Sequence, residues 1–287
     1  MMVPMSDSRR FQDLLSRVRI VLVNPSHPGN VGASARAMQA MGFSDLRLVD
    51  PEDAKIAQRA DAVALSSGAA RVLEGVQVQD LSQALCDTTW RCAMSARTRE
   101  FEPPRLTLEQ ACEAVLAHLQ AESPAQAAFV FGAERHGLTN EQVLACTHVC
   151  SLDVEEKFSS LNLSQAVQVV AYALRRAARG AMRSMSASSA SSITLEGTTA
   201  LASLEAAIDN LEARQGNNRE TSRPATHEAI MGLHDHLVRV AQRVGYLDPA
   251  VPGRFEDRLK RLLARKAMLE DEVQMLRGLC TEIERRT

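Results

Sequence analysis

Short apolar runs alternate with helical stretches between residues 18 and 182. A strand that is buried on both faces of a parallel sheet is typically a short apolar run. The alternation of such runs with helices therefore predicts a mainly parallel α/β sheet. The predicted strands cover residues 18–23, 46–49, 76–78, 91–94, 127–131 and 148–152. The predicted helices cover residues 31–41, 55–66, 81–85, 107–120 and 140–145, and a last one begins near Asn162.

The composition changes after residue 182. Residues 184–192 hold six serines and no charged residue, which predicts a flexible linker. Beyond it, apolar residues recur at helical spacing in two stripes, at 201, 204, 208 and 211 and at 230, 233, 237, 240 and 244, with helix stops expected at Gly216 and Gly245. The chain therefore divides into an N-terminal extension (1–17), an α/β domain (18–182), a linker (183–197) and a helical module (198–287).

Composition limits the kinds of function. With 3% aromatic residues, base-stacking platforms are not expected, and a net charge of −2 means that any nucleic-acid contact needs a local basic patch. Six scattered cysteines indicate free thiols in a reducing compartment. No secretory signal and no run of membrane-spanning length is found, so we expect a cytoplasmic protein.

One segment, Cys146-Thr147-His148-Val149-Cys150, has the residue types of a zinc site. Alternation along the predicted strand would place its two cysteines and its histidine on one face. No second cysteine or histidine pair lies close in sequence, so we favour buried core residues and expect no metal.

Small residues follow three of the predicted strands. The segments are Met94-Ser95-Ala96-Arg97 after the fourth, Gly132 and Glu134 after the fifth, and Leu152 with Ser159-Ser160-Leu161 after the sixth. The carboxyl ends of parallel strands share one edge of the sheet, and such walls suit a flat adenine and ribose. The chain has no GxGxxG after its first strand and no GK[ST], GxSxG or HExxH, which argues against dinucleotide, P-loop, serine-hydrolase and zinc-protease sites.

Three motifs in combination carry a family resemblance. They are Ser26-His27-Pro28-Gly29-Asn30-Val31-Gly32-Ala33-Ser34-Ala35-Arg36, Phe131-Gly132-Ala133-Glu134-Arg135-His136-Gly137-Leu138, and Ser159-Ser160-Leu161-Asn162-Leu163-Ser164. Together they resemble the SPOUT class of RNA methyltransferases, in the branch that methylates ribose. The chain is similar to the bacterial tRNA (cytidine/uridine-2′-O-)-methyltransferases over residues 20–178, and more weakly over residues 258–284.

This resemblance implies a trefoil knot, in which residues 131–164 thread through a loop of the chain, and a bent S-adenosyl-L-methionine bound in the knot. The implied cofactor contacts are Met94, Ser95, Ala96, Gly132, Leu152, Ser159, Ser160 and Leu161. The family usually has threonine where this chain has Met94, so a main-chain contact there would survive and a hydroxyl contact would not.

The resemblance makes Arg36 the catalytic residue and Asn30 the residue that shapes its loop. In the implied reaction a ribose 2′-hydroxyl attacks the sulfonium methyl. Arginine stays protonated, so we favour an Arg36 that anchors a phosphate and polarises the ribose oxygen, while proton acceptance by Arg36 stays an alternative. Glu134 either positions Arg36 or the cofactor loop, or caps a helix. His27 is expected to orient its loop.

The RNA-binding surface is expected on arginines. Arg97 and Arg99 flank the cofactor crevice, and Arg175 and Arg176 belong to a cationic run at the end of the last α/β helix. Residues 254–266, with six basic and two acidic residues, are a further candidate. The resemblance implies a homodimer that acts on the pyrimidine at position 32 of the tRNA anticodon loop. The alternatives are ribose methylation of ribosomal RNA, or a catalytically silent RNA-binding knot protein.

Overall fold

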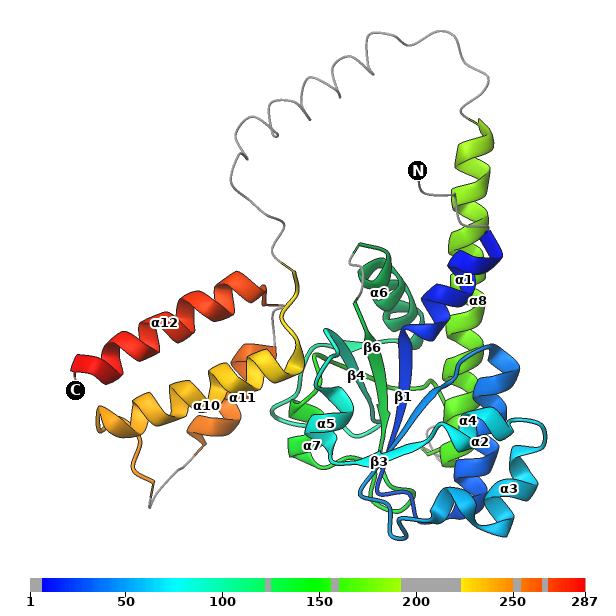
Figure 1. Ribbon diagram of the computed structural model, residues 1–287, viewed down its shortest axis with the longest axis horizontal. Helices are drawn as coiled ribbons and strands as arrows, with labels where there is room; N and C mark the ends of the chain where they lie inside the picture. The colour runs from blue at the N-terminus through cyan, green and yellow to red at the C-terminus, as the bar shows by residue number, and fades with distance from the viewer. Residues whose placement is uncertain are drawn as a thin grey trace, which may run out of the picture.

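The computed structural model describes residues 7–121, 125–155, 160–191, 223–249, 254–264 and 268–286. A seven-stranded sheet in the order β3-β2-β1-β6-β4-β7-β5 forms the centre of the larger domain (Figure 1). All of its described strand pairs are parallel, which confirms the α/β prediction. The strands are β1 (Val18–Val23), β2 (Asp45–Val49), β3 (Gln77–Gln79), β4 (Trp90–Met94), β5 (Arg105–Leu106), β6 (Ala127–Phe131) and β7 (His148–Cys150).

Alternation along the central strands builds two apolar layers, one on each face of the sheet. In β1, Ile20 and Leu22 face the larger layer, whereas Val21 and Val23 face the smaller one. The larger layer is covered by α1 (Asp7–Ser16), α2 (Pro28–Met41), α6 (Leu108–Ala121) and α8 (Leu163–Ser191). The smaller layer is covered by α5 (Leu81–Leu85) and α7 (Asn140–Leu144).

The structure departs from the predicted elements in several places. The helix α1, within the predicted N-terminal extension, buries Leu14 and Leu15 in the core, and α4 (Ala70–Glu74) and β5 were not predicted. The single helix predicted over residues 55–66 is wrong: extended Arg59 separates a 3₁₀ turn (Ile56–Gln58) from α3 (Ala60–Ser66). The helix α8 continues to Ser191, so the first part of the predicted serine-rich linker is helical. The domain boundaries stay a prediction.

Helix α2 is placed by its two ends and by one close approach. Pro28 lies in its first turn, and Gly42 ends it with a left-handed φ of 86°. At Gly32 a side chain cannot be accommodated, because a Cβ would lie 2.0 Å from the carbonyl oxygen of Ala62 in α3. Glycine therefore lets α2 and α3 pack backbone against backbone.

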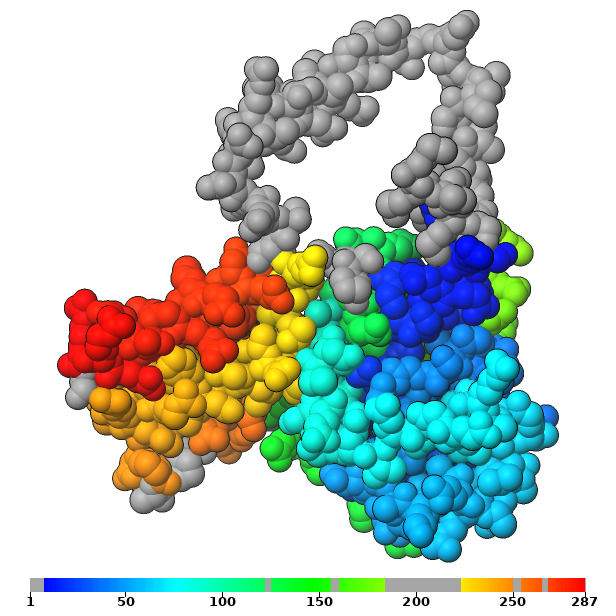
Figure 2. Space-filling model, viewed as in Figure 1, coloured from blue at the N-terminus to red at the C-terminus, as the bar shows by residue number. Residues whose placement is uncertain are grey.

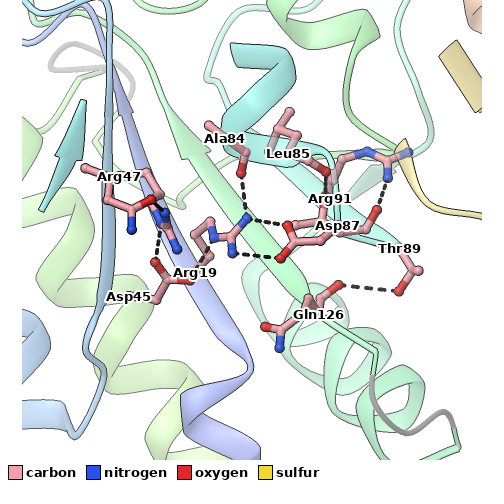
Figure 3. A network of polar contacts seen from close by, with 11 residues as sticks. Arg19, Asp45, Arg47, Ala84, Leu85, Asp87, Thr89, Arg91 and Gln126 are labelled. Carbon is pink, nitrogen blue, oxygen red and sulfur yellow. Dashed lines mark hydrogen bonds and ion pairs between the residues drawn. The ribbon is translucent and has the colours of Figure 1, made fainter. Parts of the chain in front are cut away.

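The buried side chain of Arg19 in β1 links this strand to β2 and to the end of α5 (Figure 3). Its guanidinium donates to Asp45 Oδ2 at 2.7 Å, to Asp87 Oδ1 at 2.6 Å and to the Ala84 carbonyl at 2.7 Å. Partial burial opposes ionisation of Asp87, but the hydrogen bond and the charge of Arg19 hold its pKa below the usual value. Removing Arg19 would leave the buried Ala84 carbonyl and the half-exposed Asp87 carboxylate without this donor, so the network stabilises the β1–β2–α5 corner.

The C-terminal helices are α10 (His227–Arg243), α11 (Phe255–Ala264) and α12 (Glu270–Arg286), and they share a small apolar core. The amides of His227 and Glu228 donate to the carbonyls of Thr88 and Cys86 at 3.0 and 3.3 Å, which docks this unit beside the sheet. Figure 2 shows the docked helices, coloured yellow to red, against the larger domain. The predicted stripe is confirmed at 230, 233, 237 and 240, and the stop at Gly245, with φ of 74°, is confirmed, whereas Val244 is exposed at the C-cap. The 201–211 stripe and Gly216 lie outside the described residues.

The segment Cys146–Cys150 does not form a cluster of ligands. Cys146 packs in the smaller apolar layer and Cys150 in the larger one, on opposite faces of the sheet. The prediction of a shared face is wrong because β7 begins only at His148, so strand alternation does not extend back to Cys146. Within the described ranges, no group of three or more metal-ligating side chains is found. Among the helices placed there, none is long and apolar enough to cross a membrane.

Candidate active site

A cavity of about 490 Å³ opens at the carboxyl ends of β4, β6 and β7. It is lined by seven of the eight residues predicted to contact a cofactor: Met94, Ser95, Ala96, Gly132, Leu152, Ser160 and Leu161. The eighth, Ser159, lies outside the described residues. The loop after β4, the second motif and the third motif thus form one site.

The loop after β6 is shaped by two glycines. A Cβ on Gly132 would lie 2.2 Å from the carbonyl carbon of Gly137, so only glycine lets the returning chain pass over this position. Gly137 turns the chain with a φ of 65°, and its amide donates to the Ala133 carbonyl at 2.8 Å. This tight turn forms one wall of the cavity.

The loop between β4 and β5 is held by arginines. The Arg99 guanidinium donates to Ser95 Oγ at 2.9 Å, to the Leu138 carbonyl at 2.6 Å and to Asn140 Oδ1 at 3.0 Å. Arg105 donates to the Ser95 carbonyl at 2.9 Å. The nitrogens of Arg99 thus donate to the protein and brace two walls of the cavity, and its predicted contact with RNA stays a prediction.

Glu134 fastens the start of α2 to the cavity. Its carboxylate accepts hydrogen bonds from the Ser26 amide and hydroxyl, the His27 amide and the Asn30 side chain, at 3.0–3.2 Å. Partial burial opposes ionisation, but hydrogen bonds from Asn30 and from the main chain outweigh it and lower the pKa of Glu134. A carboxylate is also favourable at a helix N-terminus. The same contacts of Glu134 therefore both position α2 and cap its first turn.

Asn30 connects all three motifs. Its Nδ2 donates to Glu134 Oε1, while its Oδ1 accepts from Asn162 Nδ2 at 2.9 Å. Asn162 Oδ1 in turn accepts from the Ser164 amide at 2.9 Å and caps α8, as expected for its predicted helix start. The first, second and third motifs therefore meet through the side chains of three residues.

Arg36 is exposed on α2, about 9 Å along the helix axis from Asn30 at 1.5 Å per residue. It does not line the cavity, and its side chain makes no hydrogen bond or ion pair in the part of the chain that the structure describes. The structure thus joins Asn30 to Glu134, which lines the cavity, and leaves Arg36 exposed on the surface of α2.

The remaining predicted RNA contacts differ from one another. Arg97 lines the cavity mouth and is exposed, and Arg176 is exposed on α8. Arg175 instead donates to the Met41 carbonyl at 2.8 Å and lies over the ring of Phe11, 5.2 Å from its centroid. Its guanidinium therefore ties α8 to the end of α2.

Two family models match this chain in succession. The model of the SpoU rRNA methylase family matches residues 17–172, and that of the C-terminal domain of the tRNA methyltransferase TrmJ matches residues 228–287. The chain is 36% identical over 276 residues to the tRNA (cytidine/uridine/adenosine-2′-O-)-methyltransferase TrmJ of Pseudomonas aeruginosa strain UCBPP-PA14, covering 95% of each chain. This chain belongs to the TrmJ group of the SpoU methylase family.

Solved structures agree with that assignment. The crystal structure of TrmJ from Z. mobilis ZM4 matches with a TM-score of 0.70 and 28% identity over 93% of this chain and 98% of that one. A probable methyltransferase from Bordetella pertussis Tohama I matches with a TM-score of 0.56 and 41% identity, over 58% of this chain and 99% of that chain.

Several residues that line this cavity were not predicted from the sequence. Arg135 and His136 are exposed at its rim, whereas Leu138 is buried in its wall. All three lie inside the second motif, so proximity to Gly132 was the available signal. The other lining residues that were not predicted are Phe131, Ala133, Gly137 and Leu163 within the second and third motifs, and Cys150, Val154 and Ala166 outside them.

Proposed function

We propose that this chain transfers a methyl group from S-adenosyl-L-methionine to the ribose 2′-hydroxyl of the pyrimidine at position 32 of tRNA. The observation that carries this proposal is a cavity formed by the second motif, the third motif and the loop after β4, to which Asn30 joins the first motif. The relatives named TrmJ support it, because they are described as tRNA 2′-O-methyltransferases of cytidine and uridine. The Pseudomonas relative is described as acting on adenosine too.

The cavity fits the proposed cofactor. Its volume of about 490 Å³ lies in the range of small-molecule sites, and Leu138, Leu152 and Leu161 supply apolar surface. Residues 94–96, Gly132, Leu152 and 159–161 would hold the cofactor. When bound, S-adenosyl-L-methionine supplies an electrophilic methyl group on a sulfonium.

Arg36 would act on the RNA. A ribose hydroxyl is a weak nucleophile, and a guanidinium that anchors the adjacent phosphate and hydrogen-bonds the ribose oxygen makes its proton easier to lose. A permanently charged side chain suits that role better than the role of a base. Asn30 and Glu134 would hold α2, and with it Arg36, in register with the cavity.

We infer a homodimer in which Arg36 of one subunit serves the cavity of its partner. Two observations support this: Arg36 does not line the cavity of its own chain, and α8 exposes Val169 and Tyr172, by 40% and 56%. The interface would use the apolar faces of α2 and α8. We further infer that residues 131–164 form a trefoil knot and that the enzyme is cytoplasmic, as the family resemblance implies.

The proposed RNA surface includes Arg97, Arg176 and exposed Arg258 of α11. Ribosomal RNA is the second candidate substrate, favoured by the description of the family that matches residues 17–172. The match to the TrmJ C-terminal domain favours tRNA. Transfer of labelled methyl groups to unmodified tRNA and to ribosomal RNA, assayed in parallel, separates the two, and no transfer to either would contradict both.

A further inference from the structure

Helix α11 of the C-terminal unit holds the tip of the β4–β5 loop. The ring of Phe101 lies near two guanidinium groups, 5.7 Å from that of Arg254 and 5.3 Å from that of Arg261. Arg254 also pairs with Glu100 at 3.5 Å. A cation within about 6 Å of a ring centroid is attracted to the ring face, so these contacts attach α11 to the loop.

The base of the same loop is a wall of the proposed cofactor cavity. Residues 94–97 line the cavity, and Phe101 follows them by a few residues. Between them the loop is stiff, because Arg105 binds both Glu102, at 2.8 Å, and the Ser95 carbonyl. A displacement at Phe101 is therefore transmitted to the cavity.

A second contact attaches α11 to α7, the helix that follows the opposite wall of the cavity. Lys260 Nζ lies 3.7 Å from Glu141 Oε1 in α7, and the Lys260 side chain is only 20% exposed. Glu141 adjoins Asn140, whose side chain accepts from Arg99. Helix α11 thus contacts both segments that Arg99 joins across the cavity.

We propose that Phe101 is a positioning residue through which the C-terminal unit holds the cofactor cavity in its binding shape. This inference rests on the proposed function only for the identity of the cofactor. It gives the C-terminal unit a role in cofactor affinity, separate from any contact with RNA. By linkage, bound cofactor strengthens the docking of α11 by the same factor.

The test is calorimetric titration of the full chain with S-adenosyl-L-methionine and with S-adenosylhomocysteine. Phe101→Leu keeps an apolar side chain but removes the ring face, and we expect it to raise Kd about five- to tenfold. Phe101→Trp retains the ring face and should bind within about twofold of wild type. The matched control is Tyr246→Leu, because Tyr246 is an exposed aromatic that contacts Phe255 within the C-terminal unit. Equal affinity of Phe101→Leu and wild type would overturn the inference.

Hydrogen exchange without ligand tests the same inference independently of the cofactor. Phe101→Leu and the double variant Arg254→Gln/Arg261→Gln should speed amide exchange in residues 95–105, whereas Tyr246→Leu should not. Unchanged exchange in that loop would overturn the inference even if the cofactor proposal holds. Faster exchange in a chain that binds neither ligand would support the inference and contradict the proposed function.

Discussion

Asn30 Nδ2 donates a 3.0 Å hydrogen bond to Glu134 Oε1 across a sequence separation of 104 residues. This contact joins the helix that carries Arg36 to the loop that forms one wall of the cavity. The same carboxylate accepts from the main chain at the start of α2. Glu134 therefore fixes the start of the proposed catalytic helix to the cavity wall.

Replacing Glu134 should impair transfer more than cofactor binding. Glu134→Gln lacks one acceptor oxygen and the negative charge, so donors at the start of α2 lose a partner at a cost of about 1–3 kcal/mol. We expect kcat to fall about 100-fold, because small displacements of positioned groups have effects of that size. Glu155→Gln, at an exposed carboxylate after β7, is the control and should retain activity. Steady-state kinetics at saturating cofactor check this; unchanged kcat in Glu134→Gln would contradict it.

Arg36→Ala should bind S-adenosyl-L-methionine normally and lose transfer by about 10²–10³-fold, as expected when one charge-stabilising group is removed. Gly132→Ala should lose cofactor binding, because its Cβ meets the backbone of Gly137.

Mixing the Arg36→Ala and Gly132→Ala variants tests whether Arg36 acts across the dimer. Random pairing should restore about a quarter of wild-type activity if Arg36 serves the partner cavity. No recovery, with heterodimers verified by mass, would place Arg36 and its cavity in the same subunit.

Two neighbouring arginines on α8 should respond differently. Arg176→Ala removes an exposed cation, and we expect weaker tRNA binding with a salt-dependence slope smaller by about one. Arg175→Ala removes the bond to the Met41 carbonyl and should lower the free energy of unfolding by about 1.5–3 kcal/mol, with tRNA affinity unchanged. Filter binding at several salt concentrations and thermal melts measure both. The reverse pattern would mean that Arg175 is the RNA contact.

Acidification should weaken the docking of the C-terminal unit through His227. Burial first, and then the charge of Arg91, lower the pKa of His227 to about 3. In the unfolded chain the pKa of His227 is about 6.5. Between about pH 3 and pH 6.5 the unfolded state therefore binds more protons than the folded state. Stability should therefore fall with decreasing pH in this window, by up to about 1.4 kcal/mol per pH unit.

Denaturant melts at pH 7.5, 6 and 5 measure this slope. His227→Gln should flatten it, whereas His136→Gln, at an exposed histidine, should leave it as in wild type. Equal slopes in wild type and His227→Gln would contradict the assignment of this pH dependence to His227.

Local pattern was sufficient to predict β1 and β6 to the residue, because both are fully buried runs, apolar except for Arg19, between polar loops. It could not predict the strand order, in which β6 lies between β1 and β4, since pairing depends on contacts across the whole domain. The two-residue strand β5 has no periodicity to detect. The sequence did not predict that Arg19 and Arg91 are buried, because their hydrogen-bond partners come from other elements.

The motifs located the cavity but not the connections within it. Ser95, Gly132 and Leu161 meet as predicted, since each follows a strand end at the same edge of the sheet. The use of Arg99 as a brace depends on acceptors at Leu138 and Asn140, which no local pattern places near it. The bond of Arg175 to α2 was not predicted for the same reason, because its acceptor lies far away in the sequence.

The most direct test of the proposed function compares two tRNA transcripts that differ only at position 32, one with ribose and one with 2′-deoxyribose at that nucleotide. Both are incubated with this chain and labelled S-adenosyl-L-methionine, and the products are mapped by mass spectrometry. We predict a single 2′-O-methylpyrimidine at position 32 of the ribose transcript and no transfer to the deoxy transcript. Equal labelling of both transcripts, or a methyl group on a base, would contradict ribose methylation at this position.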